Sequence, residues 1–113
     1  MPLLTGYIVA GVPVTFAERG WREFVGRSVY DRFPAGYEDL RSSVGELEAD
    51  DGRVIFARLG STRSRVSVEL EYTPRDAADP AGDVARAQRE LERDLGKYRE
   101  FVTRRCDEQH CRR

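Results

Sequence analysis

The sequence predicts an α+β fold in which an antiparallel sheet of about four strands packs on a long C-terminal helix. From Arg65 to Tyr72, apolar residues alternate with polar ones, which is the period of a strand with one buried face. From Pro80 to Arg105, apolar residues recur at helical spacing and most other positions are charged. Since each element has one apolar face, the simplest prediction is that the helix lies across the sheet.

Length and charge limit the classes of protein that fit. A chain of 113 residues has room for one core, so we predict a single domain over residues 1–105 and a C-terminal tail over residues 106–113. Nineteen basic and twenty acidic residues give a formal net charge of −1, which disfavours a nucleic-acid partner held by phosphate contacts. A mean hydropathy of −0.60 is typical of a soluble chain.

The N-terminal third is expected to hold one strand and one or two short helices. Residues 3–12 are rich in strand formers. Pro13 then suits the first position of a helix, which is predicted over residues 13–25 and ended by Gly26. Residues 29–33 add a further helical turn or two. The apolar start carries no basic leader region and is interrupted by glycine and proline, so we predict no membrane span and a cytoplasmic location.

The middle of the chain reads as a meander of strands. Over residues 37–48 the apolar spacing permits a helix, but a strand over residues 42–48 is favoured. Asp51-Gly52 is a hairpin-turn pair, and the strand over residues 53–59 follows it. A second turn over residues 60–64 leads to the strand that ends at Tyr72. Asp79 and Pro80 then provide the cap and the first residue of the last helix.

Three runs of the sequence resemble a known superfamily. Val54–Gly60, Thr62–Pro74 and Leu91–Val102 are similar to the C-terminal half of START-like proteins, which include polyketide cyclase/dehydrase-like, coenzyme Q-binding and lipid-transfer proteins. Residues 11–21 resemble the first strand and first helix of that family, and Phe33-Pro34 stands where many members carry an aromatic-proline pair. The resemblance implies a helix-grip fold, in which a curved sheet wraps the long helix and an apolar ligand lies between them.

A ligand site of this kind would be lined by apolar side chains from the sheet and the last helix. The resemblance implies a polyketide, lipid or quinone-like molecule as the ligand. Family members have about seven strands, so the sheet of this chain is shortened, and homodimerisation would cover the apolar surface that the missing strands expose. The residues predicted to contact the ligand are Phe56, Val68, Leu70, Tyr72, Leu91, Leu95, Tyr98 and Val102.

Other chemical groups give weaker signals. Glu69 and Glu71 share one strand face, but on an alternating strand they are expected to face water beside arginines such as Arg65. Cys106, with His110 and Cys111, lies in the predicted tail, and three such residues are one fewer than a structural zinc site normally supplies. We therefore predict no catalytic set, metal or cofactor.

Three functions remain as hypotheses. The first is binding of a hydrophobic small molecule between sheet and helix. The second is a shortened helix-grip protein that acts as a homodimeric or protein-protein interaction module. The third is an aromatase/cyclase-type enzyme, which would need a polar group such as the hydroxyl of Tyr72 or Tyr98 inside a pocket. Gly96, in the middle of the predicted helix, marks either a close approach of another element or a tolerated exposed position.

Overall fold

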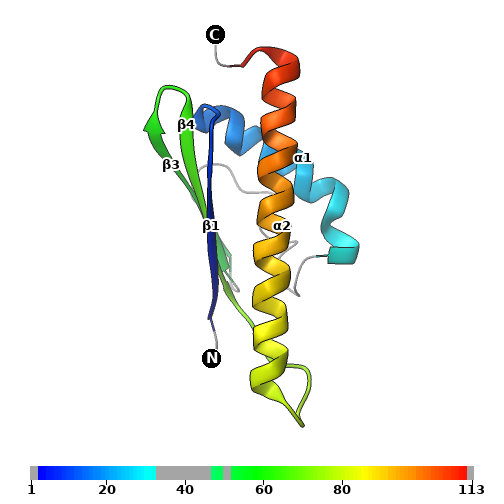
Figure 1. Cartoon of the computed structure of the whole chain (residues 1–113). Coiled ribbons are helices and arrows are strands. Elements are labelled where there is room, and N and C mark those ends of the chain that lie inside the picture. The colour runs from blue at the N-terminus through cyan, green and yellow to red at the C-terminus, as the bar shows by residue number, and fades with distance from the viewer. Residues whose placement is uncertain (1–2, 33–46, 50–51, 112–113) are drawn as a thin grey trace.

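The computed structural model describes residues 3–32, 47–49 and 52–111 of the chain, which form an α+β fold (Figure 1). The elements follow one another as β1 (Leu3–Ala10), α1 (Val14–Arg32), β2 (Leu47–Ala49), β3 (Gly52–Gly60), β4 (Arg63–Glu71) and α2 (Pro80–Gln109). Most of the predicted 37–48 segment and the Asp50-Asp51 turn lie outside the described residues. The hairpin prediction agrees with the pairing of Ala49 with Gly52 across β2 and β3.

The sheet is antiparallel, with the strand order β1-β4-β3-β2. Three of its strands are long, and the three-residue β2 pairs with the outer edge of β3. In the long strands Gly6 stands opposite Val68, which stands opposite Val54 on β3. The first strand therefore pairs with the last one, and β4 is the central strand of the three long ones.

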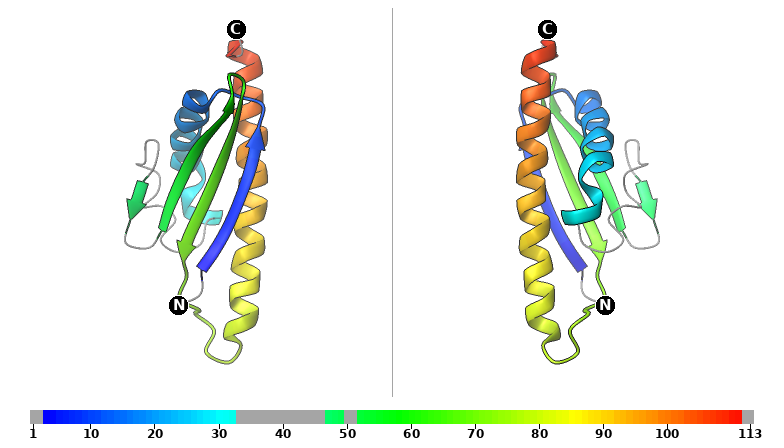
Figure 2. Two further views of the ribbon diagram at one scale, coloured as in Figure 1. Left: turned by 90° about the vertical axis from the view of Figure 1, so that its left-hand side faces the viewer. Right: turned by 90° about the vertical axis from the view of Figure 1, so that its right-hand side faces the viewer.

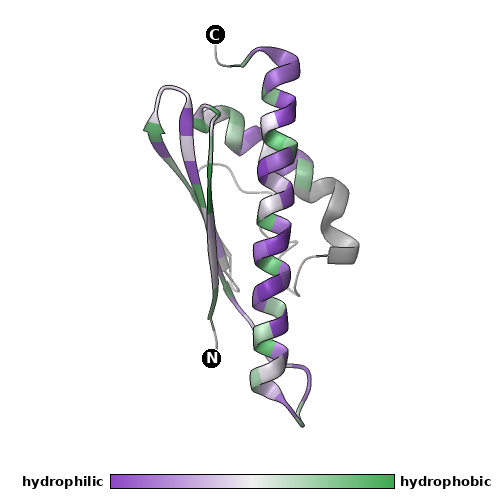
Figure 3. Ribbon diagram, viewed as in Figure 1, coloured by the Kyte–Doolittle hydropathy of each residue, from purple (hydrophilic) through white to green (hydrophobic). Residues whose placement is uncertain are grey.

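Both helices lie on the same face of this sheet, which we call the inner face (Figure 2). Alternation places Val66, Val68 and Leu70 of β4 on the inner face, and all three are buried. The stripe on α2 packs against them, as the sequence predicted: Ala87, Leu91, Leu95, Tyr98 and Val102 are buried. Figure 3 shows this alternation of apolar and charged positions along α2.

The start of α2 is set by a side-chain cap. The carboxylate of Asp79 accepts a hydrogen bond of 3.0 Å from the backbone N–H of Gly82, and Pro80 follows at the first helical position. Both features were predicted from the sequence. The end of α2 differs from the prediction, because the helix continues to Gln109 and the side chain of Cys106, one turn beyond Val102, is fully buried.

The predicted end of the first helix at Gly26 is wrong, because α1 continues without interruption to Arg32. A glycine costs about 1 kcal/mol inside a helix but leaves the backbone hydrogen bonds available, so it does not by itself end the helix. Trp21 fixes α1 to the rest of the core. Its side chain is fully buried and meets Tyr98 of α2 and Phe56 of β3 edge-on, with ring centroids 5.2 and 6.3 Å apart.

Two glycines permit close contacts of α2 with its neighbours. A Cβ atom on Gly6 of β1 would lie 2.8 Å from Leu95 Cδ1, and one on Gly20 of α1 would lie 2.7 Å from Val102 Cγ2. At Gly96 the corresponding position has no atom within 4 Å apart from the neighbouring residues and backbone of its own helix. Of the two interpretations of Gly96, the structure therefore supports the tolerated position without a close neighbour.

Gly20 and Gly96 form a matched pair of helical glycines that predicts two opposite effects. Gly20→Ala should lower the free energy of unfolding by up to about 2.5 kcal/mol, because overpacking of the contact with Val102 costs about 1–3 kcal/mol and the helix-propensity gain of about 0.5–1 kcal/mol offsets only part of that cost. Gly96→Ala should raise it by about 0.5–1 kcal/mol through helix propensity alone. Urea denaturation of both variants measures the difference, and a stabilised Gly20→Ala variant would show that α1 and α2 are not in close contact there.

Candidate functional site

The eight residues predicted to contact a ligand all belong to or pack against the core between the sheet and the helices. Seven of them are buried, with exposed fractions of 5% or less, and Phe56 is partly buried against them. Tyr98 packs between Trp21 and Phe24, with ring centroids 5.2 and 5.8 Å away. The structure thus brings the predicted residues together, as members of one packed cluster.

The hydroxyl of Tyr98 has a partner within the protein. It donates a hydrogen bond of 2.7 Å to the backbone carbonyl of Ala17 in α1. Burial raises the pKa of Tyr98 well above its usual value. The hydroxyl therefore stays protonated and links the two helices, instead of presenting a polar group to a ligand.

A buried carboxylate on α2 holds the loop that precedes the helix. The Oδ2 atom of Asp83 accepts hydrogen bonds from the backbone N–H groups of Arg75 at 2.5 Å and Asp76 at 3.2 Å. Its Oδ1 atom accepts from the Tyr72 hydroxyl at 3.2 Å and forms an ion pair with Arg86. No local sequence pattern indicates this role, because the partners come from a loop whose path depends on the fold.

Hydrogen bonding and burial shift the pKa values of Asp83 and Tyr72. The N–H of Arg75, more than any other group, holds the pKa of Asp83 below its usual value. Burial, reinforced by the hydrogen bond to Asp83, raises the pKa of Tyr72. The Tyr72 hydroxyl is thus engaged in a structural contact, as is that of Tyr98, and neither supplies a free acid or base for the enzyme hypothesis.

The pKa of Asp83 predicts a pH dependence of stability. A carboxyl whose pKa is lowered by folding stabilises the fold above its unfolded pKa of about 3.9, and the contribution is lost as the pH falls through the folded pKa. The Asp83→Asn variant should therefore be less stable than the wild type at pH 7, and the difference should shrink below about pH 4. Urea denaturation at both pH values measures it. The exposed Glu108→Gln variant is the control, and a difference for Asp83→Asn that does not change with pH would contradict the prediction.

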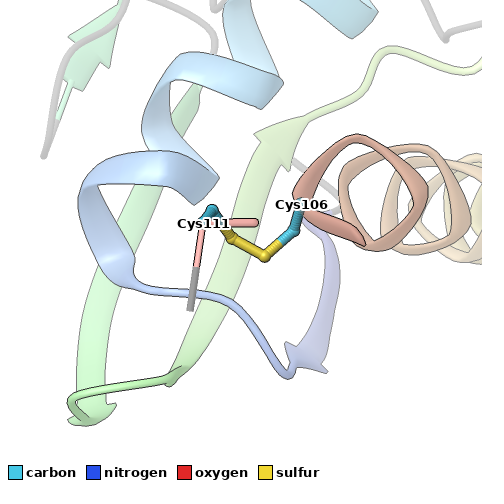
Figure 4. Close-up of a disulfide and its surroundings, with 2 residues drawn as sticks. All are labelled: Cys106 and Cys111. Carbon is cyan, nitrogen blue, oxygen red and sulfur yellow. A yellow bond between two sulfur atoms is a disulfide. The ribbon is translucent and has the colours of Figure 1, made fainter. Parts of the chain in front are cut away.

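The two cysteines form a disulfide at the end of α2 (Figure 4). Cys106 is fully buried, Cys111 packs against the core, and their Cα atoms are 4.9 Å apart. Between them His110 adopts the left-handed conformation, with φ of 53°, and the backbone N–H groups of His110 and Cys111 both bond to the Cys106 carbonyl. The disulfide thus closes the helix cap, and its two sulfur atoms are unavailable as zinc ligands.

The outer face of the sheet is the described surface without a helix over it (Figure 2). Tyr7 of β1 is 60% exposed and Leu3 is 53% exposed. The guanidinium of Arg65 lies over the Tyr7 ring, 4.3 Å from its centroid. The Nε atom of Arg53 bonds Glu69 at 2.6 Å across β3 and β4. Glu69 was expected to face water near Arg65, and the strand register instead places Arg53 beside it.

An open groove of about 580 Å³ crosses the β1 edge where Gly6 has no side chain. It joins outer-face residues, among them Tyr7, to Gln88 and Leu95 of α2. At this edge the Gln88 side chain accepts a hydrogen bond from the backbone N–H of Thr5 at 3.2 Å and donates one to the Thr5 carbonyl at 2.5 Å. Gln88 thus pairs with the edge of β1 as a neighbouring strand would.

Comparison with known proteins finds no matching family model, no matching curated protein and no matching solved structure. Within the described residues, no helix combines the length and the apolar character that a membrane crossing requires.

Proposed function

We propose that the chain is a protein-association module that binds a second copy of itself through the outer face of its sheet. The observation that carries this proposal is the contrast between the two faces. The inner face is covered by both helices, whereas the outer face carries exposed Tyr7 and Leu3 and no described helix. Exposed large apolar side chains beside charged ones are a common feature of protein contact surfaces.

The β1 edge of the sheet is a poorer candidate for this contact. Addition of a strand requires free backbone groups along β1. The amide of Gln88 already occupies both backbone groups of Thr5. Because these two groups of Thr5 are already hydrogen-bonded to Gln88, they are not available to an added strand, which favours association through the outer face.

The size of the face sets the expected affinity. Three strands about 4.8 Å apart, with eight residues in β1, present an area of roughly 26 by 14 Å, which is small for a protein interface. Interfaces of this size bind weakly, so the expected dissociation constant is on the order of micromolar or higher. Two such copies would form a reversible dimer.

Sedimentation equilibrium tests the proposal over about 1–500 μM protein, a range that brackets micromolar dissociation constants. The wild type should shift from monomer to dimer with increasing concentration. Tyr7→Ser should weaken association by about tenfold or more, because central aromatic residues dominate binding energy. Arg89→Ser on the exposed side of α2 is the control and should leave association unchanged. A monomer across the whole range would refute the proposal.

Binding of a hydrophobic ligand remains a second proposal, and the groove over Gly6 is the observation that favours it. The groove reaches Val68 and Leu95, two of the eight residues predicted to contact a ligand. A larger ligand would have to separate the packed core. Native mass spectrometry and titration with a lipophilic dye test this second function, and the absence of both a bound molecule and saturable binding would remove it. The START-like, helix-grip relationship remains a prediction.

A further inference from the structure

The outward side chains of β4 carry an ordered pattern of charge. β4 is the central strand of the three long ones, and its outward positions alternate with the buried Ser64, Val66, Val68 and Leu70. In chain order these outward residues are Arg63, Arg65, Ser67, Glu69 and Glu71. The pattern is two positive charges, a neutral centre and two negative charges, so it reverses sign about Ser67.

The neighbouring strands extend the neutral centre sideways. Tyr7 of β1 and Ile55 of β3 both stand opposite Ser67 in the sheet. The middle of the outer face is therefore a row of one hydroxyl group flanked by an aromatic ring and an aliphatic side chain. Arg65 lies on one side of this row and Glu69 on the other.

The charge row of β4 is complementary to itself in one orientation, and β3 adds the positive charge of Arg53 beside Glu69. In a face-to-face pair, a two-fold axis that lies between the sheets, perpendicular to the strands and over Ser67, reverses the strand direction of the second copy. Arg65 then stands opposite the partner's Glu69, and Arg63 opposite the partner's Glu71. An axis parallel to the strands would place like charges opposite each other, which is unfavourable.

We infer that two copies pair face to face with their strands antiparallel, with Arg65 opposite the partner's Glu69 on both sides of the Ser67 row. This inference rests on the proposed association through the outer face and adds its orientation. Both groups are held on the face within each copy, Arg65 over Tyr7 and Glu69 beside Arg53. The Glu69 side chain is still 38% exposed, and a carboxylate can accept several hydrogen bonds, so it can also bind a partner's arginine.

Charge reversal in one copy at a time tests the orientation. Arg65→Glu alone and Glu69→Arg alone each create like-charge contacts at both symmetric positions, so each should weaken self-association by about tenfold or more. When one copy of each variant pairs, the introduced glutamate faces the introduced arginine, and the native Glu69 of one copy faces the native Arg65 of the other. Sedimentation equilibrium of an equimolar mixture should therefore restore association to within about threefold of the wild type, as should the double variant Arg65→Glu/Glu69→Arg.

The controls separate this inference from the proposed function. Arg93→Glu reverses an exposed charge on α2 and should leave association unchanged. If the wild type associates but the single reversals have no effect, or the mixture does not recover, the antiparallel pairing is overturned while association through the face stands. If the wild type stays monomeric, the proposed function fails as well. If loss of the Arg53–Glu69 bridge unfolds a variant, the mixing experiment is repeated with Arg63→Glu and Glu71→Arg, because both of these residues are exposed.

Discussion

Replacement of Trp21 by alanine is expected to lower the free energy of unfolding by about 3–5 kcal/mol. Trp21 is fully buried where α1 meets both the sheet and α2, and it contacts Phe56 and Tyr98 edge-on. Its removal costs the transfer free energy of the ring. It also leaves a cavity between α1, α2 and β3, because the surrounding side chains can fill the space only in part. A domain of this size has about 5–15 kcal/mol of stability in total, so the loss is a large share of it.

Urea denaturation followed by circular dichroism measures this effect. Leu59→Ala is the control, because Leu59 is another large apolar residue of the chain but is 48% exposed at the end of β3. Its removal should change the free energy of unfolding by less than about 0.5 kcal/mol. Equal effects of the two substitutions would contradict the description of Trp21 as the residue that fixes α1 to the core.

Elements with a strong period could be predicted from the sequence, because the period depends only on which residues meet water. The alternation that ends at Tyr72 predicted β4 and its buried face. The stripe from Ala87 to Val102 predicted the buried side of α2. Asp79 and Pro80 predicted the start of that helix. In each case a local pattern contained the necessary information.

Features that depend on what lies across an interface could not be predicted in this way. The sequence does not distinguish Gly6, Gly20 and Gly96 from one another. Only the packing shows that Leu95 approaches Gly6 and that Val102 approaches Gly20. The partner of Glu69 depends on strand register, which places Arg53 opposite it. A residue's local pattern does not contain the identity of its distant neighbours.

Two further features are visible in the sequence once the fold is known. Cys106 stands four residues after Val102 and so continues the apolar stripe of α2, although its place near the chain end suggests a tail. The order of charges on the outward side of β4, from Arg63 to Glu71, follows from the same alternation that predicts the strand. Taken alone, Glu69 and Glu71 suggest a pair of carboxylates. The change of sign along the whole row is the feature that supports the proposed association.

Loss of the Cys106–Cys111 disulfide is expected to lower the free energy of unfolding by about 2 kcal/mol, the chain-entropy value for a closed loop of this length. The disulfide restricts the unfolded chain, and in the folded state it holds the cap around His110 against the core. For a domain of this size the melting temperature should fall by about 5–12 °C on reduction. Thermal unfolding with and without a phosphine reductant measures the change.

The Cys111→Ala variant is the matched control, because it lacks the disulfide but retains the buried Cys106. Its melting temperature should be close to that of the reduced wild type and should not respond to the reductant. A wild type whose melting temperature is insensitive to reductant would show that the bond contributes nothing to stability.

The cytoplasmic location predicted from the sequence is tested by the redox state of the same two cysteines in the cell. Disulfides are rare in the reducing cytosol, so a stably oxidised pair would weigh against that location.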